Sequence, residues 1–474
     1  MAAEPSGASR RDEAPRGDAR RGDAGRGEAP RGEARRVAVV GAGLAGALLA
    51  TLLARRGVAV TVYERRPDPR VAGAERGRSI NLAISARGLA ALEQVGLREL
   101  ALSRALPMHG RMVHPSGAAT NFQSYSADGT RAINSISRAE LNAALLDTAE
   151  ATPGVTLRFE HRVTAVDTAS GKLTLDGPDG TVTEPADVVL AGDGAYSAVR
   201  RGTGPGGAFD ADTDFLEHGY KELTIPPRGG DFALDPDALH IWPRGTSMMI
   251  ALPNLDRSFT CTLFWPKDDF AALDTPEAVT AHFRRHYPDA AELMPDLADD
   301  FAQNPVGSLV TVRAWPWVRI GEGASVALLG DAAHAIVPFF GQGANCAFED
   351  CLEIDRCLDE TGGDWTAALP LYQERRKANT DAIAEMALDN FVEMRDRVAS
   401  PVFRAKQAAV HALERRLAGR YVSRYELVSF STLPYAEIPA RIRKQNLAVA
   451  GVAAAGTLLA AGAVRVLRGR SRPS

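Results

Sequence analysis

The sequence predicts an α/β fold: a Rossmann-type dinucleotide-binding domain with an inserted, mostly antiparallel β-sheet domain, followed by a helical C-terminal region. A strand, a glycine-rich turn, a helix and a second strand follow one another from residue 36 onward. The middle of the chain is rich in β-branched and alternating segments. A helical stretch with few Pro or Gly residues begins after Gly341 and continues to about residue 420.

Composition restricts the function classes. A chain of 474 residues is too long for one simple core and favours two or three closely packed subdomains. Its net charge of -4 gives no reason to expect nucleic acid as a partner. The four cysteines form no CxxC pair and have no histidine at metal-ligand spacing. We therefore expect reduced thiols packed as small hydrophobic residues in a cytoplasmic protein, with no metal site and no disulfide framework.

The two ends of the chain differ from the middle. Residues 1–35 are almost free of large apolar side chains, so we expect a disordered tail, and without an apolar core it is not a signal peptide. Residues 446–474 form a hydrophobic Ala/Gly-rich helix and a basic tail. Within them Leu447–Val464 carries no charge and has arginines on both sides, which leaves two interpretations. It is a membrane anchor of marginal hydrophobicity, or an Ala-rich helix packed on the body, on a partner or in solvent.

The first motif is the glycine fingerprint. The strand Arg36–Val40 leads into Gly41-Ala42-Gly43-Leu44-Ala45-Gly46, and a helix is expected over Ala47–Arg56. Gly41 permits a tight turn, Gly43 lets the backbone approach a pyrophosphate, and Gly46 allows close helix–strand packing. The next strand, Val58–Glu64, ends on an acid that can accept hydrogen bonds from a ribose. These features predict a dinucleotide site.

A second match to the same pattern, at residues 202–207, is rejected. No β-branched strand leads into it, and Pro205 with the following residues does not indicate a helix. We interpret it as a flexible surface loop, which leaves one dinucleotide site.

The strand signals of the middle region suggest how the domains alternate. Leu239–Pro253 and Ser258–Trp265 are interpreted as a long pair of strands. The dinucleotide-binding domain is expected over residues 36–380, in the segments 36–110, 130–200 and 305–380. The sheet domain takes residues 111–129 and 201–304, and a helical region follows over 381–445.

Two further strand ends carry an acid in a glycine-rich setting. A buried strand leads to Gly192-Asp193-Gly194, with a helix expected from Ser197. Another strand ends at Gly330-Asp331, and glycine-rich backbone then opens a helix. An acid at a strand end can hold a ribityl or ribose hydroxyl, and a helix N-terminus can face a pyrophosphate or a polarised flavin edge. Together with the fingerprint, these motifs indicate an FAD site.

The three motifs, in this order, resemble the para-hydroxybenzoate hydroxylase group of single-component flavoprotein monooxygenases. Five further segments are similar to the kynurenine 3-monooxygenase family, and the resemblance covers about residues 36–440. The segments are RSINLAISAR (78–87), PMHGRMVH (107–114), HGYKELTIP (218–226), HIWPRG through TLFWP (240–266) and GDAAHAIVPFFGQG (330–343).

The resemblance implies the reaction. FAD is the cofactor, NADPH and O2 are co-substrates, and L-kynurenine is hydroxylated to 3-hydroxykynurenine through a flavin C4a-hydroperoxide. The flavin carries the chemistry, so no catalytic side chain and no metal is assigned. The pathway context, tryptophan breakdown or synthesis of nicotinamide cofactors, stays open, as do the oligomeric state and the choice between NADPH and NADH.

The resemblance also implies site residues. Ala344 stands where the family commonly has Met, and we expect little consequence because its contact with flavin is through the backbone. The substrate-binding positions are Arg111, Tyr125, Asn390 and Tyr425 for the carboxylate, and Phe339, Phe340 and Gln342 around the ring. The cofactor-binding positions are Gly41, Gly43, Ala45, Gly46, Glu64, Ala83, Arg138, Val163, Asp193, Asp331, Ala344 and Asn345.

Three alternatives remain open at this stage. The chain could hydroxylate another amino-aromatic acid, or it could be a membrane-tethered flavoprotein without hydroxylase activity. It could also be an FAD reductase that uses an acceptor other than oxygen.

Overall fold

A six-stranded sheet forms the nucleotide-binding part of the computed structural model, in the order β18-β19-β12-β1-β2-β8. Five of its strands are parallel, and β18 adds an antiparallel edge. The strand β1 is buried along its whole length, as expected for a parallel strand covered on both faces. The strands are β1 Val37–Val40, β2 Val60–Tyr63, β8 Val155–Arg158, β12 Val188–Ala191, β18 Val318–Ile320 and β19 Ser325–Leu328.

The structure describes residues 36–72, 81–202, 207, 209–417, 419–452 and 454, and these belong to one compact unit. The N-terminal tail, most of the rejected glycine match and most of the apolar run lie outside the described residues.

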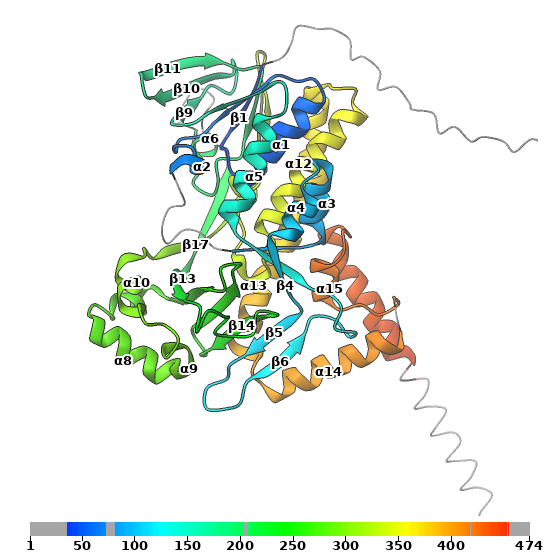
Figure 1. The fold of residues 1–474 in the computed structure, drawn as a ribbon. Coiled ribbons are helices and arrows are strands. Elements are labelled where there is room, and N and C mark those ends of the chain that lie inside the picture. The colour runs from blue at the N-terminus through cyan, green and yellow to red at the C-terminus, as the bar shows by residue number, and fades with distance from the viewer. Residues whose placement is uncertain are drawn as a thin grey trace, which may run out of the picture. The chain divides into compact units, whose positions relative to one another are not determined.

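Helices cover one side of the six-stranded sheet, and a three-stranded sheet lies on the other side (Figure 1). The helix α1 contacts both α5 and α12. It begins at Leu44, inside the glycine fingerprint and three residues ahead of the predicted start. These elements are α1 Leu44–Arg55, α5 Arg138–Glu150, α12 Gly343–Glu360, β9 Arg162–Val166, β10 Lys172–Gly177 and β11 Gly180–Pro185.

A seven-stranded sheet forms the inserted part, in the order β17-β13-β16-β15-β14-β5-β6. It is mostly antiparallel, as predicted, and β5 runs parallel to β14. The predicted long pair of strands was wrong, because a turn at residues 244–247 divides the first of them into β14 and β15. The strands are β5 Gly110–Val113, β6 Asn121–Ser124, β13 Ala211–Ile225, β14 Ala238–Pro243, β15 Met248–Pro253, β16 Phe259–Pro266 and β17 Gly307–Ala314.

The strand β17 also moves a domain boundary. Residues 305–380 were assigned to the dinucleotide-binding domain, but β17 pairs with β13 and so belongs to the inserted sheet. The inserted part therefore takes its strands from two stretches of the chain, residues 110–124 and 211–314.

Shorter elements fill the space around the two large sheets. Four short helices pack over one face of the seven-stranded sheet, where Trp265, Phe283 and Tyr287 form a second core. A small antiparallel sheet, β3-β7-β4, lies between the two large sheets in Figure 1. The four helices are α7 Lys267–Ala271, α8 Pro276–His286, α9 Pro288–Ala291 and α10 Leu297–Gln303. The small sheet consists of β3 Leu82–Ile84, β4 Ala105–Met108 and β7 Ile133–Ile136. The remaining short helices are α2 Pro69–Ala72, α3 Ala86–Gln94, α4 Arg98–Ser103, α6 Ala198–Arg201 and α11 Asp331–His334.

The C-terminal region is helical, as predicted. The helix α13 contacts α12, the six-stranded sheet and the loop after Val337, and so links the two parts of the molecule. It passes into a π-helical turn at Glu393, a feature often found at functional sites. The elements are α13 Trp365–Val392, the π-helical turn Glu393–Arg397, α14 Pro401–Arg416, α15 Arg424–Ser429 and a last helix over residues 438–452.

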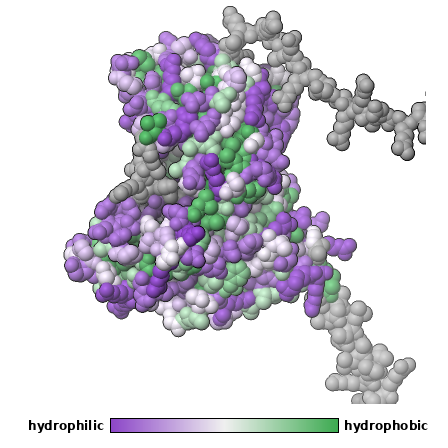
Figure 2. Space-filling model, viewed as in Figure 1, coloured by the Kyte–Doolittle hydropathy of each residue, from purple (hydrophilic) through white to green (hydrophobic). Residues whose placement is uncertain are grey.

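The four cysteines are all buried and free. No helix in the described part of the chain is long and apolar enough to span a membrane. On the face shown in Figure 2, hydrophobic residues lie in small groups among hydrophilic ones.

A buried hydrogen-bonded chain of polar groups joins the edge of the inserted sheet to α9. His114 Nδ1 lies 2.7 Å from Asp289 Oδ2, and His114 Nε2 lies 2.9 Å from Nδ1 of His240. His240 Nε2 donates to the carbonyl of Asp235 at 2.9 Å. Burial lowers the pKa of His240 to about 4, so this side chain is neutral in the folded protein near neutral pH.

This depressed pKa predicts a loss of stability in acid. Between pH 6.5 and about 4 the unfolded chain protonates His240 and the folded chain does not, so the free energy of unfolding falls as the pH falls through this window. The shift corresponds to up to ~3 kcal/mol at pH 4. Urea unfolding at several pH values should show a shallower loss for His240→Gln than for the unchanged protein. Parallel curves for the two proteins would contradict the assignment.

Candidate active site

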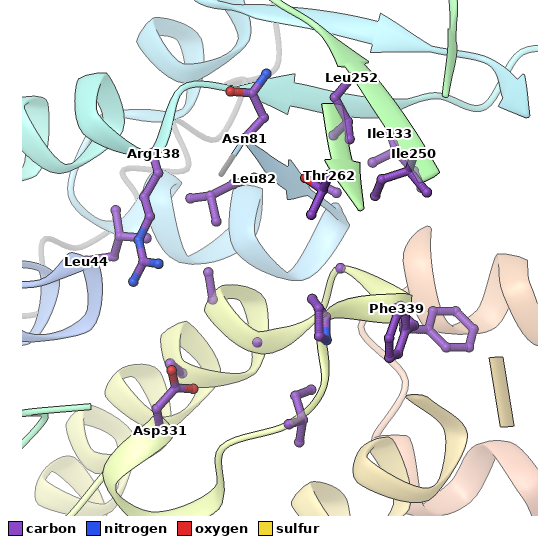
Figure 3. A pocket seen from close by; sticks show the side chains of 18 of the residues that line it. Leu44, Asn81, Leu82, Ile133, Arg138, Ile250, Leu252, Thr262, Asp331 and Phe339 are labelled. Carbon is purple, nitrogen blue, oxygen red and sulfur yellow. The ribbon is translucent and has the colours of Figure 1, made fainter. Parts of the chain in front are cut away.

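A cavity of about 300 Å³ lies where the two large sheets face each other across the small one. Its lining comes from the fingerprint turn, from β3, from the inserted sheet and from the loop between Leu329 and Ala347. Figure 3 shows Arg138 and Asp331 at one end, and Ile250, Leu252 and Thr262 at the other with Phe339 opposite. The cavity therefore has a polar end at the nucleotide-binding sheet and an apolar end at the inserted sheet.

The fingerprint turn brings backbone to the polar end of this cavity. Gly41 has φ +100°, and a Cβ there would lie 2.7 Å from the carbonyl oxygen of Gly192. A Cβ at Gly46 would lie 1.9 Å from the carbonyl oxygen of Gly41. Around Gly43, which lines the cavity, no described atom lies within 4 Å of such a Cβ. This open cradle at the start of a 12-residue helix fits a pyrophosphate.

Glu64 holds the same turn from the end of β2. Its Oε2 accepts a hydrogen bond from the backbone N–H of Ala42 at 3.0 Å, and its Oε1 pairs with Arg66 at 2.9 Å. Burial opposes the charge, but Arg66 and these backbone donors keep the pKa of Glu64 below its ordinary value. The carboxylate is therefore ionised; its hydrogen bond to a ribose hydroxyl stays a prediction.

The other two predicted acids differ in their settings. Asp193 Oδ2 accepts the backbone N–H of Ala198 at 2.7 Å, while its buried Oδ1 has no described partner. Burial raises the pKa of Asp193, and its neighbours Gly192 and Gly194, rather than its own side chain, line the cavity. Asp331 lines the cavity directly.

A buried ionic network fixes the loop that carries Asp331. Asp350 Oδ2 accepts the backbone N–H of Gly330 at 2.8 Å and lies 2.6 Å from His334 Nε2. Its Oδ1 accepts a hydrogen bond from Arg376 at 2.8 Å. Although burial opposes its charge, His334 and Arg376 hold the pKa of Asp350 below its ordinary value. The loop is thus tied to α12 by charge-assisted hydrogen bonds.

The N-terminus of the 18-residue helix α12 also faces the cavity, through Gly343 and Ala344. Asn345 lies behind this wall, where its amide donates to the carbonyls of Ala83 and Gly341 at 2.9 and 2.8 Å. The positive end of a helix at this point favours a negatively charged group in the cavity.

Arg111 is the central residue of the apolar end. It lies on β5 with its side chain 7% exposed, and its Nη1 is 3.7 Å from Oε1 of Glu393. Its Nε is buried and has no described hydrogen-bond partner. A guanidinium in this setting keeps its charge and lacks the acceptor that its fork of donors requires.

Two tyrosines flank this guanidinium. The rings of Tyr125 and Tyr425 stack with centroids 4.6 Å apart, and Arg111 Cζ lies 5.7 and 4.8 Å from their centres. Burial raises the pKa of both phenols, so both stay protonated. The hydroxyl of Tyr125 is buried without a described partner. A buried guanidinium whose Nε lacks an acceptor, beside an unpaired phenol, fits a carboxylate.

The remaining predicted substrate residues fall into two groups. Phe339 and Phe340 line the cavity, and Phe339 stacks on Phe391 at 4.1 Å between centroids. Asn390 and Gln342 are buried behind that wall instead. Asn390 donates to the carbonyl of Phe339 at 2.6 Å, and Gln342 Oε1 accepts a hydrogen bond from Tyr435 at 2.8 Å. In this structure these two amides hold the aromatic loop in place.

Not every predicted cofactor residue reaches the cavity lining. Val163 packs into the core of the nucleotide-binding part. Those that line it are Gly43, Ala45, Ala83, Arg138, Asp331 and Ala344, and those that do not are Gly41, Gly46, Glu64, Val163, Asp193 and Asn345.

The sequence reasoning missed several lining residues. They lie on the inserted sheet and at the π-helical turn. Four of them fall within the family-like segment 240–266, which was the available signal. The missed residues are Leu239, Ile250, Leu252, Thr262, Phe264 and Met394.

Comparison with known families and structures agrees with this architecture. The FAD binding domain family matches residues 34–387. The solved 2-methyl-3-hydroxypyridine-5-carboxylic acid oxygenase has the same fold, with a TM-score of 0.64 at 22% identity over 81% of this chain and 96% of that one. The p-nitrophenol 4-monooxygenase of Pseudomonas putida gives 0.62 at 21% identity over 80% and 93%. Fold and family match define an FAD-binding protein with an inserted sheet domain.

Curated relatives narrow this class further. The kynurenine 3-monooxygenase of Myxococcus xanthus is 51% identical, over 84% of this chain and 86% of its own. That of Dictyostelium discoideum is 45% identical over 84% and 88%, and that of Sus scrofa 40% over 91% and 92%. The chain belongs to the kynurenine 3-monooxygenase family.

Proposed function

We propose that this enzyme hydroxylates L-kynurenine at ring position 3, with NADPH and O2 as co-substrates and FAD as cofactor. The observation that carries the proposal is the buried pair of Arg111 and Tyr125, each with an unpaired polar atom at the apolar end of the cavity. Kynurenine combines a free α-amino acid head with an aromatic ring, which matches a carboxylate receptor beside an apolar chamber. The names of the relatives agree with this substrate.

FAD held in this cavity would supply the chemistry that activates O2, with electrons from NADPH. Gly43, the start of α1 and the start of α12 would hold its phosphates and ring, because they present open backbone to the polar end of the cavity. The carboxylates of Glu64 and Asp331 would accept hydrogen bonds from the hydroxyl groups of FAD.

The chain's own residues bind and orient the substrate. The Arg111 guanidinium binds the substrate carboxylate through bidentate hydrogen bonds. The protonated phenols of Tyr125 and Tyr425 each donate a hydrogen bond to the same carboxylate. Glu393, 3.7 Å from Arg111, balances the charge of the buried guanidinium. Phe339, Phe340 and the aliphatic side chains of the inserted sheet enclose the ring and exclude water from it.

The experiment that tests this proposal is NADPH and oxygen consumption by the FAD-loaded enzyme. L-Kynurenine should stimulate both at a ratio near one to one. Stimulation by a different amino-aromatic acid and not by L-kynurenine would favour the first alternative. Turnover without oxygen, with another electron acceptor, would favour a reductase.

We also infer that the apolar run Leu447–Val464 associates with membranes, since basic residues flank it on both sides. Deletion of residues 453–474 leaves the contact of Gln445 with Val422 in place. We expect the deletion to move the enzyme from the membrane pellet to the supernatant with unchanged kcat/KM. If the full-length enzyme is already in the supernatant after cell fractionation, the inference fails.

A further inference from the structure

The hydroxyl of Thr262 is an unexplained polar group in the apolar end of the cavity. Thr262 lies on β16 and is 0% exposed, and its Oγ1 has no hydrogen-bond partner in the described part of the chain. Its side chain lines the cavity together with Ile250, Leu252 and Phe264. Figure 3 shows it beside Ile250 and Leu252, across the open space from Phe339.

Two other buried threonines of this chain have their hydroxyls satisfied. Thr51 donates to the carbonyl of Ala47 at 3.0 Å, and Thr380 donates to that of Lys377 at 3.0 Å. An unpaired buried hydroxyl costs free energy that a valine of the same shape would avoid. A ligand group that pairs with Thr262 removes this cost.

The register of the inserted sheet places Thr262 far from the carboxylate receptor. Arg111 on β5 pairs with Leu239 on β14, and Thr262 on β16 pairs with Ile250 on β15. Three strand intervals therefore separate β5 from β16, about 14 Å at the usual spacing. A ligand whose carboxylate lies at Arg111 presents its opposite end to Thr262.

We propose that Thr262 accepts a hydrogen bond from the ring amine of the substrate and so selects ortho-aminophenyl ketones among aromatic amino acids. The inference rests on the proposed function. In such a ketone one amine N–H bonds internally to the ketone oxygen, and the second N–H points away from it. The ketone lies nearer the amino acid head, so the second amine N–H is the polar group at the far end. Through this hydrogen bond Thr262 orients ring position 3, the carbon beside the amine, which is the atom that the proposed reaction hydroxylates.

The test compares two ligands on FAD-loaded enzyme. L-Kynurenine and 3-benzoyl-L-alanine differ only in the ring amine, and their dissociation constants follow from the change in flavin absorbance. Thr262→Val should weaken L-kynurenine about tenfold, the size of one buried hydrogen bond, and leave 3-benzoyl-L-alanine unchanged. Thr262→Ser keeps the hydroxyl and should stay within about twofold of the unchanged enzyme for both ligands.

A matched control is Thr260→Val on the same strand, because that hydroxyl already accepts a hydrogen bond from Asn254 at 3.1 Å. It should alter neither dissociation constant. Equal weakening of both ligands by Thr262→Val, or no weakening of either, would overturn the inference. Failure of the unchanged enzyme to bind L-kynurenine would overturn the proposed function instead.

Discussion

Arg111→Met should lower kcat/KM for L-kynurenine by about 3 kcal/mol, or roughly 150-fold, chiefly through KM. The guanidinium is buried, and its Nε has no described partner until a carboxylate arrives. Methionine keeps the length and apolar stem but removes both the charge and the donors. Steady-state kinetics over a range of L-kynurenine concentrations measures the effect.

Two further variants separate charge from geometry. Arg111→Lys keeps the charge but not the bidentate fork, so it should fall between the unchanged enzyme and Arg111→Met. Arg131→Met removes a half-exposed cation that lies 3.7 Å from Glu426, and it should have no effect on KM. An unchanged KM for Arg111→Met would remove this residue from the substrate site.

Gly46→Ala should yield protein without bound FAD. The new Cβ would lie 1.9 Å from the carbonyl oxygen of Gly41, and neither backbone can give way without moving α1 away from β1. We expect a loss of about 3 kcal/mol or more of folding free energy from this overpacking. Flavin absorbance of the purified protein and its urea midpoint measure the two effects.

Gly43→Ala is the matched comparison, because its Cβ would enter open space beside the cavity. It should preserve the urea midpoint of the apoprotein and weaken FAD binding alone. A Gly46→Ala protein with full flavin content and an unchanged midpoint would contradict the close packing described for this turn.

Much of the fold could be predicted because local patterns determine it. The strand–turn–helix around Gly41, the acids at the ends of β2 and β12, and the helical stretch after Gly341 all depend on short-range sequence. The division of the Leu239–Pro253 segment into two strands was missed although Pro243 and Gly245 are turn signals, and Gly245 has φ +73° in the structure. The place of β17 depends on its pairing with β13, which is distant in sequence.

Only part of the candidate site could be predicted, because its residues come together through contacts between distant parts of the chain. Arg111, Tyr125 and Tyr425 lie at three separate places in the chain, and the family resemblance, not their residue types, singled them out. Asn390 and Gln342 were expected to touch substrate, but their amides are used by Phe339 and Tyr435. Whether an amide side chain points into the cavity or away from it depends on tertiary packing, which the local sequence does not show. Thr262 lies in the family-like segment TLFWP, but its unpaired hydroxyl became visible only with its neighbours in place.

The most direct test of the account is the identity of the product formed from L-kynurenine under heavy-isotope oxygen gas with NADPH. The account predicts 3-hydroxykynurenine in which the new ring hydroxyl carries one heavy oxygen atom from O2. Flavin-loaded enzyme that consumes NADPH but returns L-kynurenine unchanged, or a product whose new oxygen comes from water, would contradict it.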